Sequence, residues 1–305
     1  MLEVTLPGTG GTMPLKNRWL TCCYLRVQGR AVLIDCGEGT QIALRSAGIS
    51  AQNLELLCIT HFHADHISGL PGLLLSMGLD GRTEPLTIAG PSGLQKVVEG
   101  LRVIAPELPF SLRFTEFTEK VTRLQGAGLE ITAFSVQHTL PCCGYQFVLP
   151  RIGKFDPEKA RSNGVPMRVW GMLQKEEQVT YEGVTYTRGQ VLGAPRRGLR
   201  LVYCTDTRPC AALTEYAADA DLLIAEGMYG DDEKLAKAKE TRHMMFAEAA
   251  QTARDAGAKQ LWLTHYSPSL PDPQTYLPAA QAIFPQTSCA ADGMHTDLCF
   301  EEEDT

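Results

Sequence analysis

Hydrophobic residues in the first half of the chain come in short runs that polar residues and glycines interrupt. Short alternating or continuous apolar runs with such boundaries are typical of β-strands. The pattern predicts strands at residues 2–6, 21–27, 31–35, 54–59, 85–89, 112–117, 129–137 and 144–148. Gln28-Gly29-Arg30 joins the second and third of these as a hairpin, so the early strands are expected to run antiparallel.

The second half of the chain alternates strands with segments of helical spacing. Further strands are expected there at residues 199–204, 222–225 and 260–264, and helices at residues 211–217, 243–256 and 274–283. In the first half, helices are expected at residues 41–46 and 94–104, and the apolar residues of 67–75 also have helical spacing. Antiparallel strands followed by alternating strands and helices occur twice along the chain. The sequence therefore predicts an α/β fold in which two mixed sheets pack face to face, with helices on both outer faces.

Residues 151–199 interrupt this cycle. They include seven glycines, and their hydrophobic content predicts no second core. A short helix is expected at residues 157–162 and a hairpin around residues 181–186. We predict that residues 1–305 form a single domain in which residues 151–199 are an inserted, flexible arm.

Charge separates this arm from the rest of the chain. The whole chain has a formal charge of −7, whereas residues 151–200 contain ten Lys and Arg against five Asp and Glu, a balance of +5 that leaves −12 elsewhere. The total charge gives no sign of nucleic-acid binding. The local excess of basic residues favours a binding role for the arm over that of a surface insertion without function.

Composition sets the broad class. A hydrophobic content of 44% suits a globular protein with a sizeable core. The sequence contains no apolar stretch of about 18 residues that would predict a transmembrane helix, and its start lacks the pattern of a signal peptide. The ten cysteines lie mostly inside apolar runs, which is typical of buried thiols in a reducing compartment. We expect a cytoplasmic protein.

Candidate chemistry is concentrated directly after the strand at residues 54–59. His61, His63, Asp65 and His66 fall within six residues. Imidazole and carboxylate ligands suit zinc, and to a lesser degree iron or manganese. Since one backbone arrangement does not bring all four side chains to one ion, two ions are the simpler interpretation, with His61 and His63 on one and Asp65 and His66 on the other. The alternative is a loop of hydrogen-bonded or solvent-facing polar groups.

This segment resembles the HxHxDH signature of the metallo-β-lactamase superfamily. The resemblance implies the superfamily's αβ/βα sandwich and three further ligands, each just past a predicted strand. It assigns His61, His63 and His138 to a first zinc ion, Asp65, His66 and His265 to a second, and Asp206 as the bridge between them. Such a cage hydrolyses phosphodiesters, lactams, thioesters or lactones in that superfamily, so the metal site alone does not identify the substrate.

Other segments resemble the ribonuclease Z family, endonucleases that remove the 3′ trailer from precursor tRNA. The similar segments are residues 34–41, 61–74, 154–160 and 261–267, together with Pro14, Lys16 and Arg18 of a PxKxRN-like loop in which Trp19 replaces the usual asparagine. The resemblance implies an RNA substrate, a homodimer and a tRNA-binding arm. On this basis Pro14, Lys16 and Arg18 are candidate substrate-binding residues, as are Lys154 and Lys159 at the base of the arm.

The same resemblance assigns catalytic roles. His243 matches the first residue of the family's HST motif and would protonate the leaving 3′ oxygen, although Met244 and Met245 replace the serine and threonine. Glu226 matches the glutamate of the HEAT motif, the only residue of that motif kept here, and would orient His243. A neighbouring carboxylate favours the protonated imidazole that a general acid needs. Asp65 would be both a ligand and a proton acceptor.

Departures from the family pattern leave other functions open. Thr205 stands where glycine is usual, and the arm lacks the family's Gly-Pro pair. A diverged phosphodiesterase acting on small nucleotides or other RNA is one alternative. A non-phosphate metallo-hydrolase, or a binding protein that keeps the cage, is another. His295, which matches no motif, is expected to be structural.

Overall fold

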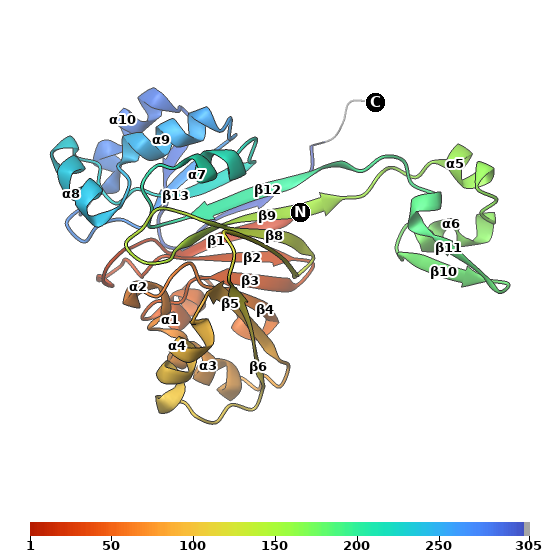
Figure 1. Ribbon diagram of the computed structural model, residues 1–305, viewed down its shortest axis with the longest axis horizontal. Coiled ribbons are helices and arrows are strands. Elements are labelled where there is room, and N and C mark those ends of the chain that lie inside the picture. Colours follow the sequence, from red (N-terminus) through yellow and green to blue (C-terminus); the bar gives the residue numbers. More distant parts are fainter. Residues whose placement is uncertain (302–305) are drawn as a thin grey trace. The chain divides into compact units, whose positions relative to one another are not determined.

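The structure is a computed structural model that describes residues 1–301. It divides into two compact units, residues 1–149 with 199–305, called here the main unit, and residues 150–198, called the arm unit. Two seven-stranded sheets make up the main unit (Figure 1). The first sheet has the order β16 (Met294–Leu298), β1 (Leu2–Gly8), β2 (Cys22–Val27), β3 (Arg30–Ile34), β4 (Leu54–Cys58), β5 (Leu86–Pro91) and β6 (Leu112–Phe117). The second has the order β15 (Thr287–Cys289), β14 (Leu261–Thr264), β13 (Leu222–Glu226), β12 (Arg196–Cys204), β9 (Cys143–Arg151), β8 (Leu129–Ser135) and β7 (Val121–Gly126).

Helices cover the outer faces of both sheets (Figure 1). On the first sheet lie α1 (Thr40–Ser46), α3 (Leu70–Leu79) and α4 (Leu94–Leu101), and on the second α7 (Ala211–Tyr216), α9 (Phe246–Asp255) and α10 (Leu277–Ile283). Shorter helical segments are η1 (Ala51–Asn53), α2 (Ala64–Ile67), η2 (Arg102–Ile104), η4 (Asp232–Lys234), α8 (Leu235–Thr241) and η5 (Pro273–Tyr276). The predicted αβ/βα sandwich is confirmed.

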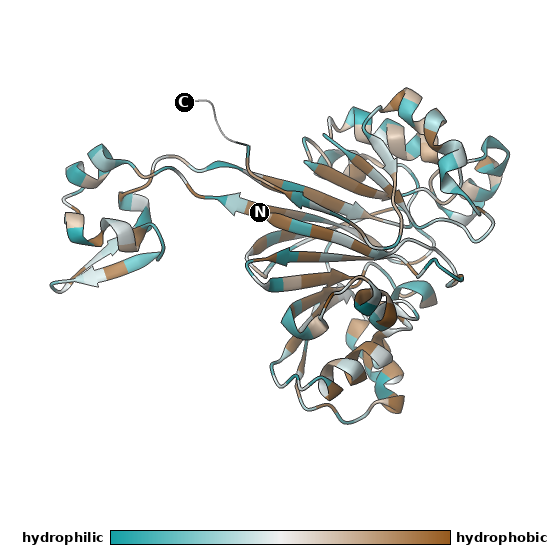
Figure 2. Ribbon diagram, turned by 180° about the vertical axis from the view of Figure 1, so that it is seen from behind, coloured by the Kyte–Doolittle hydropathy of each residue, from teal (hydrophilic) through white to brown (hydrophobic). Residues whose placement is uncertain are grey.

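The strands are apolar on both faces because each sheet is covered on both sides. In β12, Leu201 and Tyr203 join the core between the two sheets, whereas Val202 and Cys204 pack under α7 and α9. This alternation follows the two-residue period of a strand. Figure 2 shows the result as hydrophobic colour along the central strands. All ten cysteines are unpaired and eight of them are buried, so no disulfide stabilises this core.

Parallel pairing brings several strand ends to one edge of each sheet. β12, β13 and β14 are parallel, and so are β3, β4 and β5. Since the carboxyl ends of parallel strands meet at the same edge, the loops that follow them share that edge. The loops after β4, β8, β12 and β14 carry the predicted metal ligands.

The arm unit contains its own hydrophobic cluster, so the expectation that it has no core is wrong. Its elements are α5 (Pro157–Ser162), α6 (Met167–Leu173), β10 (Gln178–Tyr181), β11 (Val184–Thr187) and η3 (Arg188–Gln190). The cluster consists of Ala160, Val165, Val169, Leu173, Val179, Val191 and Leu192. These apolar residues are too widely spaced to be recognised as a core in the sequence, and α6, which supplies two of them, was not predicted.

Other differences from the predicted elements concern short segments. β7, β15, β16, α2 and α8 were not predicted. The predicted helix at residues 243–256 begins only at Phe246, so His243 lies in the connection before it. None of the helices among the described residues combines the length and the apolar character that crossing a membrane requires.

Candidate metal centre

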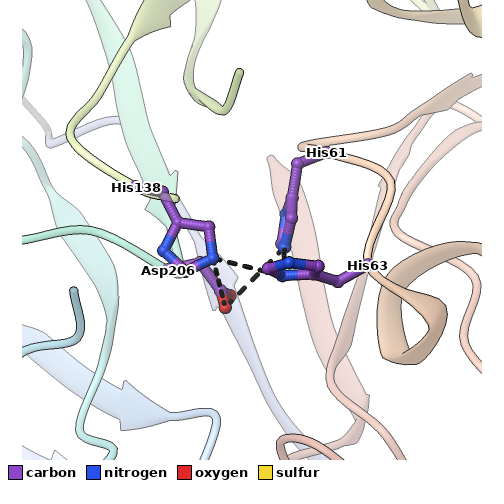
Figure 3. A group of neighbouring side chains, drawn as sticks. All are labelled: His61, His63, His138 and Asp206. Atoms are coloured by element: carbon purple, nitrogen blue, oxygen red, sulfur yellow. Dashed lines mark hydrogen bonds and ion pairs between the residues drawn. The ribbon is translucent and has the colours of Figure 1, made fainter. Parts of the chain in front are cut away.

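Seven histidine and aspartate side chains converge at the shared strand edge. His61 and His63 follow β4, His138 lies three residues after β8, and Asp206 lies two residues after β12 (Figure 3). His265 follows β14 directly, and Asp65 and His66 belong to α2. The structure therefore brings all seven predicted ligands together, although they come from positions as much as 200 residues apart.

The first group contains His61, His63, His138 and Asp206, whose candidate ligand atoms lie within 4.8 Å of one another. Nδ1 of His63 lies 2.9 Å from Nε2 of His61 and 3.2 Å from Nε2 of His138. Oδ1 of Asp206 lies 3.8 Å from Nε2 of both His61 and His138. Bonds of about 2.1 Å to a tetrahedral ion would separate two ligand nitrogens by about 3.4 Å, so this spacing suits a shared cation.

Asp65, His66 and His265 form the second group. The Nε2 atoms of His66 and His265 are 3.2 Å apart, and Oδ2 of Asp65 lies 3.5 Å and 3.4 Å from them respectively. Oδ2 of Asp206 faces this group, 3.1 Å from Nε2 of His66 and 3.3 Å from Nε2 of His265. The two oxygens of Asp206 thus point at different groups, which is the geometry of a bridging carboxylate.

Outer hydrogen bonds fix which nitrogen each histidine turns inward. Nδ1 of His66 donates to Oδ2 of Asp35 at 2.8 Å, and Nδ1 of His138 donates to the carbonyl of Arg242 at 3.2 Å. A neutral imidazole that donates from Nδ1 has its lone pair on Nε2. In the neutral form of these two histidines the inward nitrogen is therefore an acceptor, as a divalent metal requires. The residues present fit two metal ions.

Asp35 supports the metal-ligand loop through hydrogen bonds to Thr60 and His66. It is fully buried at the end of β3, and its carboxylate accepts from the backbone N–H of Thr60 at 2.8 Å and from the Thr60 hydroxyl at 3.0 Å. The same Thr60 oxygen accepts from Nδ1 of His61 at 3.0 Å. One buried carboxylate therefore orients ligands of both groups. Asp35 lies in residues 34–41, one of the segments similar to the ribonuclease Z family, but no role was predicted for it.

Buried carboxylates make the pocket strongly attractive to cations. Burial alone raises the pKa of Asp206, but His265, His66 and His61 outweigh burial, and the pKa lies well below its usual range. The reverse holds for His265, whose burial lowers its pKa while Asp206 and Asp65 raise it to about 10. Asp35, Asp65, Asp206 and Glu226 thus give the site a negative field.

Two ligands sit at strained backbone positions. Asp206 has φ 38° and His265 has φ 58°, and Asp35 in the supporting shell has φ 63°. Left-handed conformations of non-glycine residues cost of order 1–3 kcal/mol each and persist where surrounding contacts enforce them. The strand ends therefore turn sharply to aim these side chains at the site.

The glycine-rich turn after β1 packs against the second group. The backbone N–H of Thr12 donates to Oδ2 of Asp65 at 2.7 Å, and that of Gly11 to the carbonyl of Tyr266 at 2.9 Å. A Cβ on Gly11 would lie 2.8 Å from the His265 ring, so only glycine fits there. No pattern in the sequence predicted the contact of this turn with the site.

His243 and Glu226 form a pair at the rim of the site. Glu226 is the last residue of β13 and fully buried, and its Oε2 accepts from Nδ1 of His243 at 2.9 Å. The His243 ring stacks on His265 with centroids 5.6 Å apart. Burial lowers the pKa of His243, but Glu226 outweighs that effect and raises it above its usual value. The raised pKa favours the protonated form of His243, which lies beside Asp206 and His265.

The candidate substrate-binding residues lie in two places. In the main unit, Lys16 is exposed and Pro14 partly exposed, whereas Arg18 donates to the carbonyls of Leu270 and Pro271 at 2.7 and 2.8 Å. Arg18 therefore anchors its loop to the segment that follows His265. The other two, Lys154 and Lys159, belong to the arm unit, where the Lys159 ammonium donates to the carbonyl of Leu192 at 2.8 Å.

Comparisons with known proteins find two family models and full-length relatives. A family described as "Beta-lactamase superfamily domain" matches residues 165–266, and one described as "Anti-Pycsar protein Apyc1" matches residues 2–101. Ribonuclease Z of Lachnospira eligens is 52% identical over 303 residues, which cover 99% of this chain and 100% of that protein. The corresponding protein of Agathobacter rectalis is 51% identical with the same coverage. This chain belongs to the ribonuclease Z family.

A solved structure of another ribonuclease Z-type protein shares the fold. The short form of human tRNase Z superposes with a TM-score of 0.69 at 24% identity, over 98% of this chain and 100% of that one. Membership of the ribonuclease Z family makes the chain a metal-dependent hydrolytic endoribonuclease. The His/Asp groups described above are its candidate site for divalent metal.

We expect this ribonuclease Z family member to bind two equivalents of divalent metal, because its seven candidate ligands form two groups that share Asp206. Asp206→Ala should lower the content to about one equivalent or less, since both ions lose a ligand and the histidines lose their counter-charge. Elemental analysis of protein prepared with supplemented zinc measures this. Asp80→Ala, at an exposed aspartate of the main unit, is the control and should keep both equivalents. Less than one equivalent in the unaltered protein, with no change in Asp206→Ala, would exclude a dinuclear centre.

Proposed function

We propose that this protein is a zinc-dependent phosphodiesterase that removes the 3′ trailer from precursor tRNA, with a water molecule as the nucleophile. The observation that carries the proposal is the His243–Glu226 pair beside two groups of metal ligands. A site that only positions metals and water does not need a protonated imidazole. A site that must release a ribose 3′ oxygen does, because an alkoxide is a poor leaving group.

The direct test is cleavage of a 3′-extended tRNA, with mapping of the product ends. We expect a single cut that leaves a 3′ hydroxyl on the tRNA and a 5′ phosphate on the trailer. The same protein is offered a cyclic nucleotide and an unstructured RNA of equal length. Faster turnover of either than of the extended tRNA would replace this proposal with that of a diverged phosphodiesterase.

The ligand sets proposed from the superfamily resemblance are compatible with the geometry. His61, His63 and His138 would hold one zinc ion, Asp65, His66 and His265 the other, and Asp206 would bridge them. When bound, two such ions lower the pKa of water and stabilise negative charge on the phosphate. Zinc is proposed because imidazole nitrogens predominate among these ligands.

The protein's own groups would handle the protons. Asp65 would take the proton that the attacking water loses, since one of its oxygens is held by the Thr12 N–H and faces His265. As the phosphorus–O3′ bond breaks, His243 would give its proton to the departing oxygen. Because Glu226 occupies Nδ1, the nitrogen that donates is Nε2. The buried Glu226 carboxylate would stabilise the imidazolium until then.

His243→Ala should lower turnover of the RNA substrate by about 10²–10⁴-fold, the usual contribution of general acid catalysis, while metal content stays full. The loss should shrink sharply for bis-p-nitrophenyl phosphate, whose acidic phenol leaves without a proton. Steady-state kinetics on both substrates and metal analysis measure this.

His295→Ala is the matched control for that variant, because His295 is exposed on β16 and is expected to leave both rates unchanged. Equal losses on the two substrates in His243→Ala would show that His243 maintains the metal site rather than donating a proton.

Substrate binding is proposed for Lys16, Pro14 and Arg18 of the main unit and for Lys154 and Lys159 of the arm unit. The support for the two lysines of the arm unit is the basic charge of residues 151–200 on an otherwise acidic chain, and that for the other three residues is the family resemblance of their loop. A basic surface binds the phosphate backbone with an affinity that falls steeply as salt rises. The cytoplasmic location expected from the sequence stays a prediction.

Deleting residues 154–194 should weaken binding of precursor tRNA and leave hydrolysis of bis-p-nitrophenyl phosphate largely unchanged, because the metal ligands lie in the main unit. Filter binding at several salt concentrations measures the affinity. Lys154→Gln with Lys159→Gln keeps the hydrophobic cluster of the arm and should reduce both affinity and salt dependence by a smaller amount. Unchanged tRNA affinity after the deletion contradicts a binding role for the arm.

The same deletion tests the expected homodimer. We propose that the arm of one subunit binds the RNA that its partner cuts. A mixture of the arm deletion with Asp206→Ala would then form hybrid dimers with one intact arm and one intact site on opposite subunits. Such a mixture should cleave precursor tRNA faster than the sum of the two separate variants. No gain on mixing rules out an arm that acts on the partner's site.

A further inference from the structure

Arg208 links the bridging aspartate loop to the segment that carries His243. It follows Asp206 by two residues, and its backbone N–H donates to the carbonyl of Gln137 at 3.0 Å, next to His138. Its side chain is only 16% exposed. The Nη1 group donates to the backbone carbonyl of His243 and, at 2.8 Å, to Oε2 of Glu248.

Glu248 completes this link from the other side. It lies in the first turn of α9, and its Oε1 accepts from Nη2 of Arg208. Its Oε2 also accepts from the backbone N–H of Met245 at 2.9 Å, the residue just before the helix. One carboxylate therefore caps α9 and fixes the guanidinium group, and the planar fork of arginine suits this two-point contact.

The contacts close a ring around His243. The backbone N–H of Thr207, next to Arg208, donates to Oε1 of Glu226 at 2.6 Å, and Oε2 of Glu226 accepts from Nδ1 of His243. The carbonyl of His243 accepts a hydrogen bond from Nη1 of Arg208, which closes the ring. Residues 207 and 208 thus hold His243 twice, through the imidazole and through the backbone.

Local support for His243 is confined to the backbone: its N–H donates to the carbonyl of Ala238 at 2.8 Å. It lies between the end of α8, where Arg242 has φ 59°, and the start of α9 at Phe246. Met244 and Met245 have no hydroxyl group to fix this connection, unlike serine or threonine at the start of a helix. A shift of about 1 Å in a reacting group can cost about 10²-fold in rate.

We propose that Arg208, held by Glu248, is a positioning residue that keeps Nε2 of His243 aligned with the leaving oxygen. The inference rests on the proposed role of His243 as the general acid. The side-chain hydrogen bonds of Arg208 reach none of the seven predicted metal ligands. Its effect should therefore be confined to reactions that need the proton.

The test compares Arg208→Gln with the unaltered protein on 3′-extended tRNA and on bis-p-nitrophenyl phosphate. We expect kcat on the RNA to fall about 10- to 100-fold, with KM, metal content and kcat on the aryl diester close to unchanged. Arg254→Gln, at an exposed arginine of the same helix α9, is the matched control and should change none of them. Arg208→Lys keeps the charge but loses the fork, and should fall between Arg208→Gln and the unaltered protein.

A double-mutant cycle with His243→Ala decides between positioning and a general structural role. If Arg208 acts through His243, adding Arg208→Gln to His243→Ala should cause no further loss on RNA. Multiplicative losses, or equal losses on both substrates, would overturn the inference. Should Arg208→Gln fail to fold, the cycle is run with Arg208→Lys, and the same outcomes decide.

The results on His243 and on extended tRNA distinguish a failure of the proposed function from a failure of the inference about Arg208. If His243→Ala loses as much on the aryl diester as on RNA, His243 is not the general acid, and the inference falls with that role. If extended tRNA is not cleaved at all, a dinucleotide with a 3′ oxygen leaving group replaces it. The ratio of dinucleotide to aryl turnover then tests Arg208 in the same way. A lower ratio in Arg208→Gln supports positioning, and an unchanged ratio contradicts it.

Discussion

The fold must hold several imidazole nitrogens and carboxylates close together in one buried site. Nitrogen atoms of His61, His63 and His138 lie about 3 Å apart, and the carboxylate of Asp206 stands between them and a second set of like groups. Hydrophobic burial alone would never select such an arrangement, because lone pairs and charges repel and prefer water. Rigid strand ends impose it, and the buried carboxylate of Asp35 keeps the rings turned inward from behind.

The packing of the two apolar sheets makes these strand ends rigid. One hydrophobic cluster lies between the sheets, and two more lie between the sheets and the helices. The strands are therefore packed on both faces, and the loops at one edge begin at well-packed strand ends. The strained backbone at Asp206 and His265 can be sustained only on such strand ends. The packing of the two sheets thus compensates for the strained backbone that orients the ligands.

Much of this arrangement could be predicted because its signals are local. His61, His63, Asp65 and His66 share one loop, and the strands before them are continuous apolar runs. His138, Asp206 and His265 needed the family resemblance, since nothing in their own neighbourhoods marks them as partners. The support of Arg208 for His243 and of Thr12 for Asp65 could not be predicted, because these contacts join segments that only the folded chain brings together. The short elements β7, β15 and α8 were missed because they lack an apolar period, and the arm cluster was missed because its residues are widely spaced in the sequence.

The arm unit enters and leaves the main unit through β9 and β12, which are neighbours in one sheet. The sheet already holds these two ends together, so an insertion there adds almost no loop-closure entropy to the folding of the sandwich. The hydrophobic cluster of the arm compensates for the conformational entropy that the inserted residues lose on folding. Substitutions, insertions and deletions within the arm unit can therefore accumulate without destabilising the main unit. Such a junction lets the arm unit diverge in evolution at a different rate from the main unit, which carries the candidate metal ligands.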